Sequence, residues 1–199
     1  MNDEVHRSLV WLKDGGAELS EVKLARSRLS ALGCAIGSDP VPYRLEYVLT
    51  TGESYVTSSL RVHTSGVGWR RSVELHRDGN GRWRFVADAE GGLDAPPPGG
   101  DASLFDGALD CDLGLSPLTN TMPMLRHGLL SPAGSVDLLM AWVSVPGLAI
   151  SPSAQRYTPI SQAGSTSVVR FDSEGFGADI VVDHDGFVLD YPGIGHRPR

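Results

Sequence analysis

A strict two-residue alternation of apolar and polar side chains constrains the fold of this chain more than any other feature. A β-strand with one buried face has this period, whereas an α-helix has a period near 3.6 residues. The alternation is clearest over residues 43–50 and returns over 55–64, 73–75 and 83–87. The sequence therefore predicts a mostly β protein.

Two tight turns separate pairs of alternating segments. Asp78-Gly79-Asn80-Gly81 lies between residues 73–75 and 83–87, and Asp183-His184-Asp185-Gly186 lies between 176–182 and 187–191. Glycine, asparagine and aspartate readily adopt the backbone angles that short turns between antiparallel strands need. Both segments are predicted to be β-hairpins, and the 24 glycines and 13 prolines agree with a chain rich in turns.

More strand candidates follow between and before these hairpins. The stretch Ser20–Leu32 is ambiguous, because Val22, Ala25, Leu29 and Leu32 also fit helical spacing, and strand is favoured. The other candidates are residues 9–12, 19–36 in part, 108–113, 135–145, 155–160 and 167–171. Ten or more short strands predict one large antiparallel sheet, which must curl, split or close. Its concave face must then hold either side chains or a ligand.

The stretch Ser116–Arg126 breaks the alternation. Ser116 followed by Pro117 is typical of a helix start, and Pro123 would interrupt a longer helix. Five polar or charged residues are interleaved here with leucines and methionines. Two interpretations remain equal: a rigid turn that binds the polar head of an amphiphile, or a structural plug that seals one end of the sheet.

Length and charge narrow the function. The 199 residues suit a single domain spanning 1–199, with Glu90–Gly100 as an exposed proline-rich loop. The net charge of −7 argues against nucleic-acid binding. The longest apolar run, Leu138–Val143, is far shorter than the roughly 20 residues of a membrane span. An acidic start without an apolar run predicts no secretion signal and a cytoplasmic protein. Whether it forms a homodimer stays open.

Cysteines and histidines give no metal or cofactor signature. Cys34 and Cys111 are far apart in sequence, and two buried thiols in a reducing compartment are favoured over a disulfide. The six histidines show no metal-ligand spacing, so neither a metal nor a cofactor is predicted.

Several polar residues are candidates for binding or catalysis. Asp110 and Asp112 share one face of a predicted strand. They would hold a divalent cation, divide acid–base roles or form a solvated strand edge. Gln155 and Tyr157 follow Pro152 on a predicted strand, and Tyr191 ends the last hairpin. These tyrosines would line a cavity or cover its rim.

The segment Leu109–Arg126 resembles the signature of the bacterial "putative glycolipid-binding" family. That signature runs roughly Asp-x-Asp-Leu, then Ser/Thr-Pro-x-Thr-Asn-Thr-Leu-Pro-Ile-Arg-Arg. Here residue 125 is leucine, so Arg126 alone remains of the usual arginine pair. Flanking agreement comes from residues 43–47, 81–83, 155–157 and 188–192, so the resemblance spans nearly the whole chain.

This resemblance implies a strongly bent antiparallel sheet that encloses helical or loop elements, similar to the periplasmic carriers of lipoproteins. The leading hypothesis is a non-enzymatic carrier or sensor of an amphipathic ligand such as a glycolipid or fatty-acyl compound. One alternative is a small hydrolase or isomerase in which Asp110 or Asp112 is the base and Arg126 stabilises negative charge. Carboxylate pKa values that are shifted inside a pocket would favour this alternative. The other is a structural domain with a side-chain-filled sheet. The predicted ligand-binding residues are Asp112, Ser116, Thr119, Asn120, Thr121, Arg126, Gln155, Tyr157, Asp190 and Tyr191.

Overall fold

The computed structural model describes residues 4–131 and 134–198. Strands dominate it, as the alternation predicts. The strands are β1 Val5–Lys13, β2 Gly16–Leu24, β3 Leu29–Gly37, β4 Tyr43–Thr51, β5 Thr57–Gly66, β6 Trp69–Arg77, β7 Trp83–Gly91, β8 Asp110–Leu113, β9 Val136–Val143, β10 Ile150–Ala163, β11 Thr166–Ser173, β12 Phe176–Asp183, β13 Val188–Tyr191 and β14 Gly195–His196. The helical elements are the 3-10 turns η1 Glu53–Tyr55, η2 Ala102–Phe105 and η3 Pro117–Asn120, and the α-helix α1 Thr121–Arg126.

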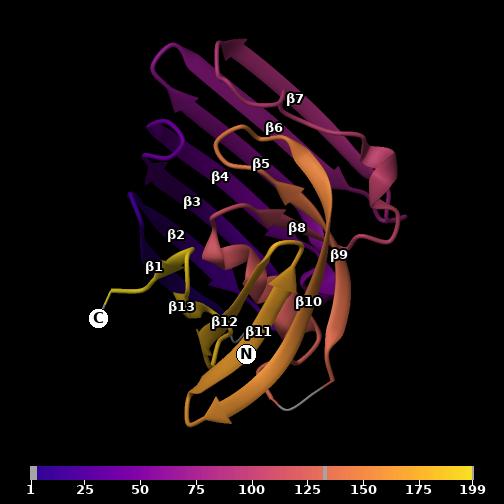
Figure 1. Cartoon of the computed structure of the whole chain (residues 1–199). Helices are drawn as coiled ribbons and strands as arrows, with labels where there is room; N and C mark the ends of the chain where they lie inside the picture. Colours follow the sequence, from indigo (N-terminus) through magenta and orange to yellow (C-terminus); the bar gives the residue numbers. More distant parts are fainter. Residues whose placement is uncertain (1–3, 132–133, 199) are drawn as a thin grey trace.

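The strands form one curved sheet in the order β7-β6-β5-β4-β3-β2-β1-β14-β13-β12-β11-β10-β9-β8. Figure 1 shows β1–β7 as one wall and β9–β12 curling over the opposite side, with the short helix between them. The sheet is not closed into a barrel, because its two edge strands, β7 and β8, do not pair. The prediction of a large curled sheet is confirmed, with one difference: β8 runs parallel to β9, so the sheet is mixed.

Both predicted hairpins are present, and their turns have the same construction. The Asp78 carboxylate accepts hydrogen bonds from the backbone N–H groups of Asn80 and Arg82, both at 2.9 Å. The Asp183 carboxylate accepts from Asp185 and Phe187 in the same way. An aspartate that binds the backbone of the following residues fixes the turn, and the strand register follows from it.

The ambiguous stretch Ser20–Leu32 is strand, as favoured. It divides into the end of β2 and the start of β3, and the two strands pair from Gly16–Gly37 to Leu24–Leu29. The helical spacing did not predict the structure here, because burial alternates along β2, where every second residue from Glu18 to Leu24 is buried. Strand pairing with β1 and β3 therefore outweighed the local helical pattern.

The centre of the concave face is filled with side chains. Leu49, Leu60 and Val62 of the sheet belong to one hydrophobic cluster with Leu118 of η3 and Met122 of α1, and none of the five is exposed. We call η3 and α1 together, residues 117–126, the plug. Pro123 is the third residue of α1, where a helix needs no backbone donor, so the helix accommodates it.

The proline-rich loop is tied to the sheet by one arginine. Arg71, on β6, is buried, and its guanidinium donates to the backbone carbonyls of Leu93, Ala95, Pro96 and Gly147. Several residues of the segment 90–100 are exposed, as predicted, but the carbonyls of Leu93, Ala95 and Pro96 point inward to Arg71. These bonds hold the loop against the sheet and leave its backbone little freedom to act as a linker.

The two cysteines differ in their surroundings. Cys111 is buried on β8, whereas Cys34 is exposed on β3, and neither forms a disulfide. The prediction of two buried thiols is therefore wrong for Cys34, because residue 34 lies on the outer face of the sheet, between the buried positions 31 and 35. Within residues 4–131 and 134–198, no helix has the length and apolar character to cross a membrane.

Candidate functional site

A cavity of about 680 Å³ opens at one end of the curled sheet. Its walls come from the turns β3–β4 and β11–β12, the connection β9–β10, the end of β13, and the segment that leads from β8 into the plug. The apolar wall consists of Pro40, Leu113, Leu115, Trp142, Val145, Pro152, Ala154, Phe171, Phe176, Tyr191 and Ile194. The polar lining residues, which alternate along the chain with apolar ones and are called the polar wall below, are Asp39, Asp112, Ser116, Asn120, Ser151, Ser153, Gln155, Ser173 and Glu174, and Gly114 completes the lining.

Asp112 is the acidic residue of the cavity lining that other side chains hold most firmly. Its Oδ1 accepts a hydrogen bond from the Thr119 hydroxyl at 2.8 Å, and its Oδ2 accepts one from Gln155 Nε2 at 2.7 Å. Burial raises the pKa of Asp112 above its ordinary value, against the two hydrogen bonds, which lower it. The nearby Asp110 carboxylate raises the pKa further. Asp112 therefore combines a fixed orientation with a perturbed acidity at a cavity wall.

An amide pair extends the polar wall next to Asp112. The Tyr157 hydroxyl lies 3.0 Å from Asn120 Oδ1 and 3.1 Å from Gln155 Oε1, and one proton serves either acceptor. The Asn120 amide also donates to the Pro117 carbonyl at 3.2 Å. These contacts fix the orientation of both amide groups. Because Tyr157 is fully buried, its pKa is raised well above the usual value.

Arg126 does not line the cavity. Its guanidinium forms a bidentate pair with Asp110, with Nη1 at 2.7 Å from Oδ1 and Nη2 on Oδ2, and both side chains are almost fully buried. Its Nε lies 3.3 Å from His127 Nε2, and burial and the adjacent guanidinium lower the pKa of His127. Arg126 joins the end of α1 to β8. Its predicted roles, binding a head group or stabilising negative charge in the cavity, receive no support from this position.

Ser116 links the cavity to a buried polar cluster. Its hydroxyl lines the cavity and donates to Glu18 Oε1 at 2.6 Å. The Tyr47 and Ser20 hydroxyls also donate to Glu18 Oε1, at 3.0 and 3.2 Å, and Lys13 pairs with Oε2. Ser116 is the residue before η3, as predicted, but its side chain is used by Glu18 and does not cap the turn.

The other predicted residues take varied places. The Thr119 hydroxyl donates to Asp112, and the hydroxyl of the buried Thr121 donates to the Gly186 carbonyl at 3.0 Å. Asp190 lines a separate hollow near the C-terminal residues His196 and Arg197. The structure therefore brings five predicted residues to the cavity wall. They are Asp112, Ser116, Asn120, Gln155 and Tyr191.

Sequence reasoning missed most of the apolar wall and the buried carboxylate of Glu18. Trp142 and Phe176 lie at strand ends, where nothing in the sequence indicates that a sheet will bend them together. Glu18 carried a usable signal, because it is in phase with Ser20 and Val22 on the buried face of β2. An acidic residue in a core position predicts a buried partner.

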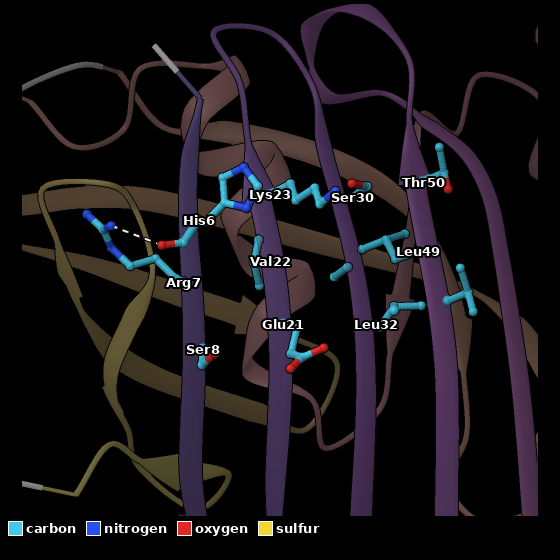
Figure 2. Close-up of a pocket in the computed structure, with 12 residues that line it drawn as sticks. His6, Arg7, Ser8, Glu21, Val22, Lys23, Ser30, Leu32, Leu49 and Thr50 are labelled. Carbon is cyan, nitrogen blue, oxygen red and sulfur yellow. Dashed lines mark hydrogen bonds between the residues drawn. The ribbon is translucent and has the colours of Figure 1, made fainter. Parts of the chain in front are cut away.

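A second hollow, of about 480 Å³, lies on the other side of the sheet, over β1–β4. Figure 2 shows its lining side chains, among them His6, Arg7, Glu21 and Lys23, with the helix and the opposite strands behind the sheet. Arg7 pairs with Asp185, and the polar residues stand exposed along the strands. Of the described residues that line this hollow, only apolar ones are buried, so the cavity beside the plug is the better candidate site.

Comparisons with known proteins agree with this architecture. A DUF1089 family protein from Pseudomonas aeruginosa has a crystal structure similar to this chain, with a TM-score of 0.69 and 28% sequence identity over 92% of each chain. No curated protein matches. The model of the family described as "Putative glycolipid-binding" matches residues 8–197. This chain therefore belongs to that family.

Proposed function

We propose that the protein binds an amphipathic ligand, such as a glycolipid or a fatty-acyl compound, in the cavity beside the plug, without catalysis. The observation that carries the proposal is that the cavity is lined both by aromatic and aliphatic side chains and by amide and carboxylate groups that hydrogen bonds hold in place. Its volume lies in the usual range for small-molecule sites, roughly 300–1,000 Å³. The family description is consistent with a lipid-like ligand.

The filled core limits how such a ligand sits. Because Leu118 and Met122 of the plug occupy the centre of the concave face, we place both the polar head and the first part of the apolar chain in the open cavity. Affinity then comes mainly from the methylenes that contact Trp142 and Phe176, at about 0.8 kcal/mol for each one buried. We also propose a cytoplasmic location, which two unpaired cysteines support.

Native mass spectrometry of the purified, never-denatured protein tests this proposal. We expect an adduct of small-molecule mass that disappears on solvent extraction and is identified by lipid analysis. The variant Ser153→Phe narrows the cavity and should lose the adduct, whereas Ser161→Phe on the same strand lies outside the cavity and should keep it. A bare mass, unchanged after incubation with total bacterial lipid, would support the structural alternative instead.

A second candidate function rests on the raised pKa of Asp112 at the cavity wall. A carboxyl group with this property suits general acid–base chemistry in a hydrolase or isomerase. Arg126 has no part in it, since Asp110 holds its guanidinium. If the protein turns over ester or glycoside substrates and Asp112→Asn abolishes this turnover, catalysis is favoured. If the protein binds a ligand but turns over no such substrate, carriage is favoured.

A further inference from the structure

The charged side chains that line the cavity beside the plug are all acidic. Asp39 and Glu174 lie exposed at its rim, and the partly buried Asp112 is the third carboxylate in its lining. Among the described residues that line it there is no lysine, arginine or histidine. A ligand that enters therefore meets a field that repels anions and attracts cations.

These three carboxylates differ from the acidic residues nearby. Asp110 pairs with Arg126, and Asp172 pairs with Arg170. By contrast, within the described part of the chain Asp39, Asp112 and Glu174 form no ion pair with a basic side chain. Their negative charge is therefore left for a ligand to compensate.

Tyr191 provides an independent indication of a ligand. Its side chain lines the cavity although the residue is only 5% exposed. Its ring is held against Phe171 and Phe176, with centroid separations of 5.9 and 6.1 Å. Among the residues that the structure describes, none forms a hydrogen bond with its hydroxyl, and this oxygen keeps some accessible surface, since no fully buried side-chain oxygen there lacks a partner. A buried tyrosine normally has a partner for this group, which a polar ligand would supply.

The three carboxylates are too dispersed for a metal ion. In the described part of the chain, no group of three histidine, cysteine, aspartate or glutamate side chains is arranged to hold one. An organic cation spreads its charge over several atoms and also interacts with aromatic faces, which Trp142, Phe176 and Tyr191 provide here.

We propose that the polar end of the ligand carries an organic ammonium group, held between Asp112, the rim carboxylates and the aromatic wall, and that anionic head groups are excluded. This inference rests on the proposed ligand-binding function and narrows its chemical class.

Three dodecyl amphiphiles, used below their micelle concentrations, test the charge preference: dodecyltrimethylammonium, dodecyl maltoside and dodecyl phosphate. Binding is followed by quenching of tryptophan fluorescence, with Trp142→Phe to assign the signal to the cavity, and by the adduct mass in native mass spectrometry. We expect the ammonium probe to bind roughly tenfold more tightly than the phosphate probe at low salt, with the difference shrinking as salt rises.

Matched variants separate the cavity charge from the net charge of the protein. The variant Asp39→Asn with Glu174→Gln changes exposed rim residues and should fold normally, and it should lose severalfold in affinity for the ammonium probe. The control Glu21→Gln with Glu46→Gln removes the same charge from the outer face and should leave the affinity unchanged.

Two outcomes overturn the inference. If dodecyl phosphate or dodecyl maltoside quenches Trp142 at least as tightly as the ammonium probe, the charge preference is wrong while ligand binding stands. If no probe binds and the purified protein carries no adduct, the proposed function fails and the inference fails with it.

Discussion

Asp110 and Arg126 form a bidentate ion pair that joins strand β8 to the end of α1, with the two side chains 1% and 8% exposed. The pair lies behind the cavity and locks the plug against the sheet edge. Burial raises the pKa of Asp110, while the guanidinium opposes this change. Arg126, the one arginine that this segment shares with the family signature, therefore has Asp110 as a structural partner.

Replacing Arg126 with methionine should therefore destabilise the protein severely. The change leaves Asp110 buried without its counter-charge, which typically costs about 3–5 kcal/mol. Urea unfolding followed by circular dichroism measures the loss. The double variant Asp110→Asn with Arg126→Met should recover a large part of it, because no uncompensated charge remains. A double variant as unstable as the single one would show that the charge is not the cause.

Tyr47→Phe tests the buried cluster around Glu18. The Tyr47 hydroxyl donates to a charged acceptor inside the protein, and such a bond contributes about 1.5–3 kcal/mol. Tyr55→Phe is a matched control, because the Tyr55 hydroxyl donates to the neutral Arg26 carbonyl at 2.7 Å and contributes about 0.5–1.5 kcal/mol. The free energy of unfolding should fall more for Tyr47→Phe. Equal losses would mean that the Glu18 charge adds nothing.

Most of the sheet could be predicted from local pattern. The alternation in β4 and the aspartate-led turns at Asp78 and Asp183 depend on neighbouring residues alone, so the hairpins followed from the sequence. The parallel pairing of β8 with β9 did not follow from the sequence, because these strands are separated by the plug in the chain. Period-2 alternation is also the same for parallel and antiparallel strands.

The candidate site was predictable only in part, for a related reason. The segment Ser116–Arg126 stood out because it broke the alternation. In the structure Leu118 and Met122 fill the concave face, while Ser116 and Asn120 line the cavity, and binding of a polar head group there stays a prediction. Which polar side chains face the cavity depends on tertiary partners. Arg126 points to Asp110, whereas Asn120 reaches the wall beside Tyr157.

Arg71→Lys should loosen the proline-rich loop. The guanidinium serves four carbonyls through its planar fork, and a lysine ammonium has three donors and a different geometry. Limited proteolysis should then cut residues 92–100 much faster than in the wild type, while the far-ultraviolet circular dichroism stays the same. Arg61→Lys on the neighbouring strand β5, an exposed partner of Glu74, is the control and should not change the cutting rate.

Only one of the two thiols should react in the native protein. Cys34 is exposed, whereas burial raises the pKa of Cys111 to about 12 and keeps it protonated. A colorimetric thiol reagent should titrate one equivalent in native buffer and two in denaturant. The variant Cys34→Ser should lose the fast equivalent. Rapid reaction of Cys111 would show that β8 opens readily, in conflict with its buried packing.

Asp112 should give the stability of the protein a characteristic pH dependence. Its pKa is raised in the folded state, so between the unfolded value of about 3.9 and the folded value the native protein binds more protons than the unfolded chain. The contribution of Asp112 to stability therefore falls as pH rises through this window and is constant above it. Asp112→Asn has no titrating group at this position, so the free energy of unfolding of the variant, minus that of the wild type, should rise over the same window.

Urea unfolding from pH 4 to pH 8 measures this difference. A difference that falls with pH would mean that the Asp112 carboxylate is stabilised by its neighbours. Because the charged form costs stability at neutral pH, a ligand that compensates this charge would also raise the melting temperature more at pH 7 than at pH 4.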